Sequence, residues 1–139
     1  MKSDAEGIKD LRDIRIDARF PDLAGKTAVV TGASRGIGCG IASFLGAQGM
    51  RVVITARTED KGIAFAGQLA AAGVACVWVT ADVSTADGAA AVFDAAFRQF
   101  GAVDLLVNNA ANLRSKAFLD LDPDTYVASF ERNVRMVYE

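Results

Sequence analysis

The chain has 139 residues, 52% of them hydrophobic and 23% charged, and its formal net charge is −2 at pH 7. This length suits one globular domain, and without a basic surplus the composition gives no indication of nucleic-acid binding. The chain contains no histidine, which excludes imidazole as a general base or metal ligand, and we expect no metal site. The two cysteines, Cys39 and Cys76, form no CxxC motif and are expected to be small buried residues.

Residues 1–22 are expected to form a charged extension that precedes the domain. Acidic and basic residues alternate from Asp4 to Arg19, whereas a secretory signal has an uncharged apolar core and a transit peptide is poor in acids. No apolar run reaches the ~20 residues that span a bilayer. We therefore expect a cytoplasmic protein with no membrane partner, whose domain occupies residues 23–139.

Short apolar runs alternate with amphipathic stretches from residue 26 onward. The first run predicts a strand at 26–31, followed by a helix at 37–48 that ends at Gly49. A strand at 51–55 and a helix at 60–72 come next, and then a strand at 74–80. The third helix is capped by Ser84 or Thr85 and extends to residue 100, before a strand at 102–107. Asp122 and Pro123 begin a fourth helix that continues toward the end.

This order alternates strand and helix four times. Strands this apolar are covered on both faces, which indicates a parallel sheet. Right-handed crossovers then give an α/β fold, a Rossmann-type doubly wound parallel sheet, which we expect to be truncated after the fourth β-α unit. Ligands bind to such sheets at the carboxyl ends of the strands, where the winding reverses.

A glycine-rich turn follows the first predicted strand, from Thr31 to Gly38. Gly32 permits a tight exit from the strand, while Gly36 and Gly38 allow backbone to approach a pyrophosphate at the helix N-terminus. Ser34 and Arg35 add a hydroxyl and a positive charge. The spacing differs from G-x-G-x-x-G, and no Lys-Ser/Thr pair of a Walker loop follows. The alternative is a tight strand-to-helix turn that binds no ligand.

These motifs together resemble the short-chain dehydrogenase/reductase family. The turn Thr31-Gly32-x-x-x-Gly36-x-Gly38 matches the family's TGxxxGxG cofactor motif, and Asn108-Asn109-Ala110-Ala111 resembles its NNAG motif, with alanine in place of the last glycine. The resemblance covers residue 23 to the C-terminus. It implies hydride transfer between a nicotinamide cofactor and a carbonyl or alcohol carbon, and a chain that is the N-terminal, cofactor-binding part of such an enzyme.

The resemblance also implies roles for individual residues. The residues expected to bind the cofactor are Gly32, Ser34, Arg35, Gly36, Ile37, Gly38, Arg57, Asp82, Val83, Asn109 and Ala110. Asp82 and Val83 would meet the adenine ring, although Asp82 could simply cap its turn. Asn108 is expected to be mainly structural. Asn133 matches the family's catalytic asparagine, although an asparagine within a helix usually faces solvent.

The end of the second strand favours NADP over NAD. An acid there would accept hydrogen bonds from the ribose 2′-hydroxyl and select NAD, but this chain has Ala56 followed by Arg57. Arginine suits a 2′-phosphate through charge-assisted hydrogen bonds, and Arg35 would face the same group. The alternative is that Arg57 is a solvated charge paired with Glu59 or Asp60.

The family's catalytic serine and Tyr-x-x-x-Lys arrangement are not found before Glu139. Tyr126 and Tyr138 have no lysine four residues later. We therefore expect a fragment or a truncated gene product that binds the cofactor without turning over. A non-catalytic nucleotide-binding or redox-sensing module is the second hypothesis, and a scaffold that leaves the turn empty is the third. Family members imply a homo-oligomer, and the substrate stays open.

Overall fold

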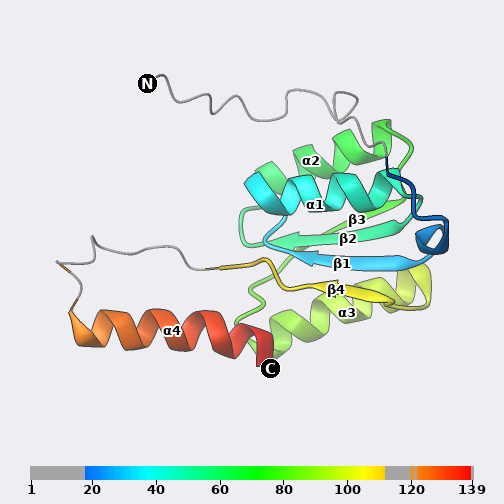
Figure 1. The fold of residues 1–139 in the computed structure, drawn as a ribbon. Coiled ribbons are helices and arrows are strands. Elements are labelled where there is room, and N and C mark those ends of the chain that lie inside the picture. Colours follow the sequence, from blue (N-terminus) through cyan, green and yellow to red (C-terminus); the bar gives the residue numbers. More distant parts are fainter. Residues whose placement is uncertain (1–17, 112–119, 121, 139) are drawn as a thin grey trace, which may run out of the picture.

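The computed structural model describes residues 18–111, 120 and 122–138 of the chain. After a short 3-10 helix, Pro21–Leu23, the elements in chain order are β1 (Thr27–Thr31), α1 (Gly36–Ala47), β2 (Arg51–Ala56), α2 (Glu59–Ala71), β3 (Cys76–Thr80), α3 (Ala86–Phe100), β4 (Leu105–Val107) and α4 (Pro123–Tyr138). All eight predicted elements are present, so the alternation of strands and helices read from the sequence is confirmed (Figure 1).

The four strands form one parallel sheet in the order β3-β2-β1-β4. The chain winds from β1 through β2 to β3, and then crosses to the other side of β1 to add β4. The winding therefore reverses between β1 and β4, which is the point where ligands bind in doubly wound sheets. This order confirms the predicted Rossmann-type fold.

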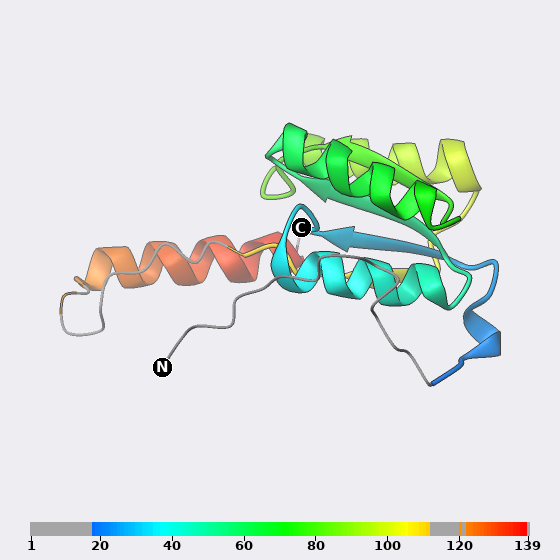
Figure 2. The same ribbon diagram turned by 90° about the horizontal axis from the view of Figure 1, so that it is seen from above.

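Helices cover both faces of the sheet (Figures 1 and 2). α1 and α2 lie on one face and α3 on the other. Successive residues of a strand point to opposite faces, so Val30 of β1 packs under α1 and α2 while Val29 packs toward α3.

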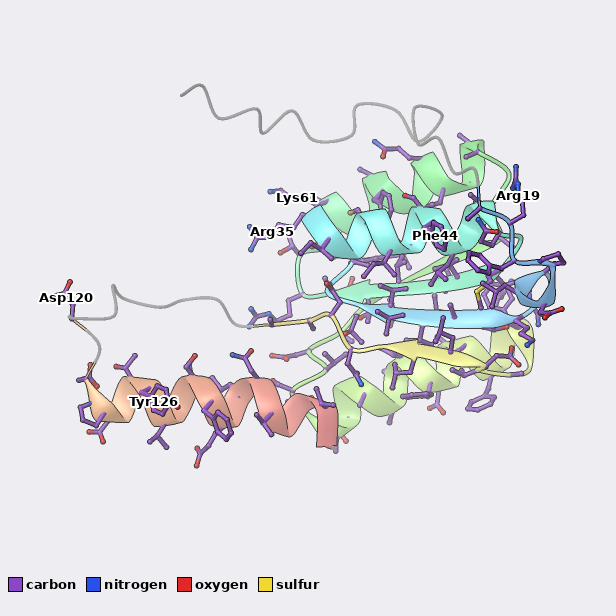
Figure 3. The ribbon with its side chains drawn as sticks, in the orientation of Figure 1. Arg19, Arg35, Phe44, Lys61, Asp120 and Tyr126 are labelled. Atoms are coloured by element: carbon purple, nitrogen blue, oxygen red, sulfur yellow. The ribbon has the colours of Figure 1, made fainter. Side chains whose placement is uncertain are left out.

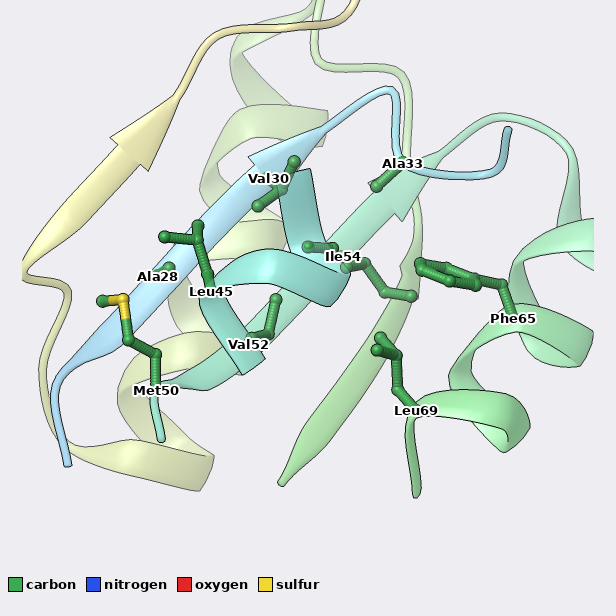
Figure 4. Close-up of a cluster of buried hydrophobic side chains, with 10 residues drawn as sticks. Ala28, Val30, Ala33, Leu45, Met50, Val52, Ile54, Phe65 and Leu69 are labelled. Atoms are coloured by element: carbon green, nitrogen blue, oxygen red, sulfur yellow. The ribbon is translucent and has the colours of Figure 1, made fainter. Parts of the chain in front are cut away.

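Two hydrophobic clusters fill these layers. The larger one lies under α1 and α2 and is shown in Figure 4; its buried members are Ala28, Val30, Ala33, Ala42, Leu45, Met50, Val52, Ile54, Phe65 and Leu69. The smaller one joins Val29 and Val53 of the sheet to Val92 and Ala96 of α3. Because β1 and β2 are central, their residues are buried on both faces, whereas β3 and β4 are only half-buried.

The first described residues, 18–25, lie against the C-terminal end of α1. The side chain of Gln48 accepts a hydrogen bond from the Phe20 amide (2.9 Å) and donates one to the Ala18 carbonyl (3.2 Å). The Phe20 ring packs edge-on against Phe44, with ring centroids 6.2 Å apart. Arg19 donates to the Ala47 carbonyl at the end of the helix. This segment is therefore bound to the domain by three side chains.

The fourth helix begins as the sequence predicts. Asp122 accepts hydrogen bonds from the amide (2.8 Å) and hydroxyl (2.7 Å) of Thr125, and Pro123 occupies the first helical position. From there α4 extends beyond the sheet and approaches it with its C-terminal end, where Val137 lines a pocket beside α3 (Figures 1 and 2).

In the part of the chain that the structure describes, no helix is long and apolar enough to cross a membrane. No group of three or more cysteine, aspartate or glutamate side chains in the same part could hold a metal ion.

Candidate dinucleotide-binding site

The glycine turn lies at the carboxyl edge of the sheet, between the ends of β1 and β4. The Thr31 hydroxyl is its anchor: it donates to the Val107 carbonyl (3.2 Å) and accepts from the amides of Asn109 (3.0 Å) and Ala110 (2.9 Å). The Asn109 side-chain amide in turn donates to the carbonyls of Thr31 (2.8 Å) and Gly32 (3.3 Å). These bonds fix the glycine turn to the segment that follows β4.

These hydrogen bonds, which we call the asparagine brace, correct one expectation. Asn108 was expected to be the structural asparagine, but the side chain that ties the backbone together is that of Asn109. Asn108 is exposed and lines the pocket beside α3. Asn109 therefore shapes the turn, while its contact with a bound cofactor stays a prediction.

Two of the glycines are required by packing. Gly32 has φ +66°, and a Cβ there would lie 2.8 Å from the Ala110 Cα. A Cβ on Gly38 would lie 2.6 Å from the Gly32 carbonyl oxygen and 2.7 Å from the Asn109 amide nitrogen. Gly38 thus allows α1 to pack closely on the turn, which is a different reason from the expected approach to a pyrophosphate.

Gly36 differs from Gly32 and Gly38, because the space around it is open. Its φ is +57°, and nothing lies within 4 Å of the position a Cβ would take. Arg35, at the N-cap of α1, makes no side-chain capping bond, so the first amides of the helix point outward without a partner from that side chain. Free amides and the positive end of the helix dipole favour a phosphate. Ser34 is half-buried beside this position, and Arg35 and Ile37 are exposed.

The helices away from the glycine turn are capped at their N-termini by nearby side chains. The Thr85 hydroxyl accepts from the Gly88 amide at the start of α3 (3.1 Å), and Asp122 caps α4. α1 and α2 have no such cap. The helix N-termini without a side-chain cap therefore lie after β1 and β2.

Basic side chains lie near the N-termini of α1 and α2. Arg57 follows β2 and is exposed, and no ion pair joins it to Glu59 or Asp60 in the described part of the chain. Figure 3 shows Arg35 and Lys61 extending past the carboxyl edge of the sheet, Arg35 from the start of α1 and Lys61 from the first turn of α2. Lys61 was missed at the sequence level; its place in the first turn after β2 is the signal that could have found it.

Asp82 follows β3, with Val83 half-buried behind it. Its carboxylate oxygen Oδ1 accepts hydrogen bonds from the Ser84 hydroxyl (2.6 Å) and amide (3.0 Å). These bonds, with a smaller contribution from the positive charge of Arg57, lower the pKa of Asp82 below its ordinary value. Asp82 therefore carries a negative charge at neutral pH and is available as a hydrogen-bond acceptor. Arg57 and Asp82 link the ends of β2 and β3 electrostatically.

Asn133 lies on α4, half-buried, and its side-chain amide donates to the Ser129 carbonyl one turn earlier (3.0 Å). This bond is local to the helix. The catalytic role that the family resemblance implies for Asn133 stays a prediction. Residues 112–118, which by the family resemblance could border a substrate pocket, lie outside the described residues.

A pocket of about 190 Å³ lies on the α3 side of the sheet. Its polar lining residues are Thr31 and Asn108, and the rest of its wall is apolar, including Val83, Phe93 and Val137. Typical ligand pockets measure about 300–1,000 Å³, so this one is too small for a dinucleotide. The candidate site is instead the open carboxyl edge formed by the turn, Arg57 and Asp82.

Comparison with known proteins identifies the family of the chain. The family model described as short chain dehydrogenase matches residues 26–139. The chain is 46% identical over 92 residues to 3beta-hydroxysteroid dehydrogenase 1 of Eggerthella lenta, which covers 66% of this chain and 35% of that protein. It is 38% identical over 120 residues to the L-rhamnose 1-dehydrogenase (NAD(P)(+)) of Azotobacter vinelandii, covering 84% and 47%. The chain thus spans less than half the length of these curated relatives.

Solved structures of this kind are also similar. A short-chain dehydrogenase/reductase from Burkholderia phymatum in complex with NAD has a TM-score of 0.76 at 33% identity, over 86% of this chain and 42% of that one. A short chain dehydrogenase from Burkholderia cenocepacia in complex with NADP has a TM-score of 0.73 at 37% identity, over 84% and 48%. With the glycine turn, its asparagine brace and the sheet order, these matches show that the chain belongs to the short-chain dehydrogenase family.

Proposed function

We propose that this chain is the cofactor-binding part of an NADP-dependent oxidoreductase, which transfers hydride between nicotinamide and a carbonyl or alcohol carbon. The nicotinamide supplies or accepts the hydride when bound. The residues of this chain would form the cofactor-binding site: the amides at the start of α1 would hold the pyrophosphate, and Asp82 and Val83 would contact the adenine. On the family resemblance we also propose a cytoplasmic location and a homo-oligomer.

The observation that carries the choice of NADP is the charge at the end of β2. Ala56 stands where an acid would select NAD, and the exposed Arg57 follows without an ion-pair partner in the described chain. Arg35 and Lys61 extend over the same edge (Figure 3). A 2′-phosphate would be held there by charge-assisted hydrogen bonds, which contribute more than neutral ones. The relatives include proteins named with either cofactor, so the preference rests on these side chains.

The test is a titration of NADPH and NADH, followed by the fluorescence of Trp78, the only tryptophan in the chain. We expect the wild-type chain to bind NADPH more tightly than NADH. Replacing Arg57→Ala should weaken NADPH binding roughly 10- to 100-fold, because a hydrogen bond to a charged group contributes about 1.5–3 kcal/mol. NADH binding should change little, since NADH has no 2′-phosphate.

Arg98→Ala is the matched control. Arg98 is an exposed arginine in the last turn of α3, and among the described residues its side chain bonds only to the Asp94 carbonyl of its own helix. The control should leave both affinities unchanged. Equal affinity for NADPH and NADH in the wild-type chain would refute the NADP preference, and no binding of either would refute the cofactor role.

A further inference from the structure

The turn between β3 and α3 holds the Asp82 carboxylate in one orientation. Ser84 donates twice to the same carboxylate oxygen, Oδ1, from its hydroxyl at 2.6 Å and its amide at 3.0 Å. The Asp82 main chain is fixed as well, since the Thr85 hydroxyl donates to its carbonyl at 2.9 Å. An exposed aspartate would otherwise rotate freely, so this arrangement immobilises both ends of the residue.

The two hydroxyls that follow Asp82 have different tasks. Either was expected to cap α3, and the structure assigns the cap to Thr85. A Cβ on Gly88 would collide with the Asp82 carbonyl oxygen, so the turn and the start of α3 are in close contact. The Ser84 hydroxyl takes no part in that cap. Its bond to the carboxylate is therefore an additional feature of the turn rather than a requirement of the helix.

The second carboxylate oxygen of Asp82 stays available. No hydrogen bond to Oδ2 is found among the residues that the structure describes, and Asp82 is exposed at the carboxyl edge. The Arg57 side chain attracts the carboxylate electrostatically from the end of β2. A fixed carboxylate with one free oxygen is suited to accept a hydrogen bond from an N–H donor of a ligand bound over β2 and β3.

We propose that Ser84 is a positioning residue, which holds the Asp82 carboxylate so that its free oxygen accepts a hydrogen bond from the exocyclic amino group of the adenine. This inference rests on the proposed dinucleotide function. Fixing the acceptor before binding removes an ordering cost of about 0.5–1.5 kcal/mol, which corresponds to roughly a two- to twelvefold gain in affinity. Ser84 thereby contributes to selection of adenine over bases that lack an amino group.

The experiment compares NADPH with its deamino analogue, in which hypoxanthine replaces adenine and a carbonyl oxygen replaces the amino group. Both ligands are titrated into the full chain by Trp78 fluorescence, using wild type, Ser84→Ala and Ser84→Thr. We expect wild type to prefer NADPH, and Ser84→Ala, which loses the hydroxyl bond and retains the amide bond, to weaken NADPH binding by up to roughly twelvefold with little effect on the analogue. Ser84→Thr, which retains a hydroxyl, should restore the preference.

A merely structural role for Ser84 would weaken both ligands alike, and that outcome would overturn the inference. Unchanged NADPH affinity in Ser84→Ala would overturn it too. Equal binding of the two ligands by wild type would remove the adenine contact while leaving the proposed cofactor role intact. No binding of NADPH at all would refute the proposed function itself, and this inference with it. Thermal unfolding of each variant verifies that the domain remains folded.

Discussion

Thr31 and Thr55 are register partners at the carboxyl ends of neighbouring strands, and both are buried. Their hydroxyls have opposite surroundings. That of Thr31 makes three hydrogen bonds to the end of β4 and the segment after it, whereas that of Thr55 finds no partner among the described residues. A buried polar group contributes to stability only when it is paired. These two threonines therefore form a matched pair in which the same substitution should have different effects.

Thr31→Val should lower the free energy of unfolding by roughly 2–4 kcal/mol, because two amides and a carbonyl lose their partner at once. It should also weaken NADPH binding, since the brace shapes the glycine turn. Thr55→Val replaces an unpaired hydroxyl by a methyl of the same shape, so its unfolding free energy should stay within about 1 kcal/mol of wild type or exceed it. Urea unfolding measures both values. Similar losses in the two variants would contradict the hydrogen-bond assignment.

At the scale of single residues, the sequence predicts which residue types occupy the site better than it predicts their hydrogen-bond partners. The glycine turn and the asparagine pair were recognisable from their spacing, and both lie where expected. Which asparagine ties the backbone, and which hydroxyl caps α3, was not predictable. Asn108 and Asn109 differ in the direction of their side chains, and the direction of the Asn109 side chain depends on contacts with Thr31 and Gly32, 78 and 77 residues earlier in the chain.

At the scale of elements, the segment before β1 is bound to the end of α1 through Gln48. Only 6% of the Gln48 surface is exposed, and its amide bonds to the main chain on both sides of Arg19. Replacing Gln48→Ala leaves the Phe20 amide and the Ala18 carbonyl without these partners. We expect a loss of about 1–3 kcal/mol of unfolding free energy, measured by urea titration.

Gln68→Ala is the control for that change, because Gln68 is exposed on α2. Alanine has a high helix propensity, so this variant should unfold like wild type. If Gln48→Ala were equally stable, the contacts of residues 18–20 would contribute nothing measurable to the domain.

Element bounds differ from the predicted ones where apolar residues enter a strand from a loop. The strand predicted at 74–80 begins at Cys76, because Val74 packs against Gly46 of α1 instead. The strand predicted at 102–107 begins at Leu105, since the Asp104 carboxylate takes the Thr27 amide at 2.7 Å. Hydrophobicity alone does not distinguish these contacts from strand pairing.

At the scale of the whole molecule, the sheet has a fully buried centre and half-buried outer strands. Cys76 and the Cys39 thiol of α1 were expected to be buried, and both are only half-buried. The cause for Cys76 is its position at the start of β3, the strand that ends the sheet on one side. Cys76 nevertheless packs against the larger hydrophobic cluster. Because this packing partly buries the thiol, the free energy of unfolding depends on whether the thiol is ionised.

Burial raises the pKa of the Cys76 thiol from 9.0 to about 11. Below pH 9 the thiol is protonated in both the folded and the unfolded chain, so its contribution to stability is fully present. Between pH 9 and 11 the unfolded chain releases this proton while the folded chain retains it, which favours unfolding. Allowing for the partial exposure of the thiol, we expect about 1 kcal/mol of stability to be lost over this range.

Cys76→Ala isolates this contribution. The variant should be less stable than wild type at pH 7, because it leaves a small cavity, but the difference between the two proteins should shrink as the pH rises from 9 to 11. All other ionisable groups are the same in both proteins, so only the difference in unfolding free energy reports on the thiol. Burial also raises the pKa of Cys39, and this contribution cancels in the comparison. A constant difference across the range would mean that the Cys76 thiol ionises as freely in the fold as in the unfolded chain.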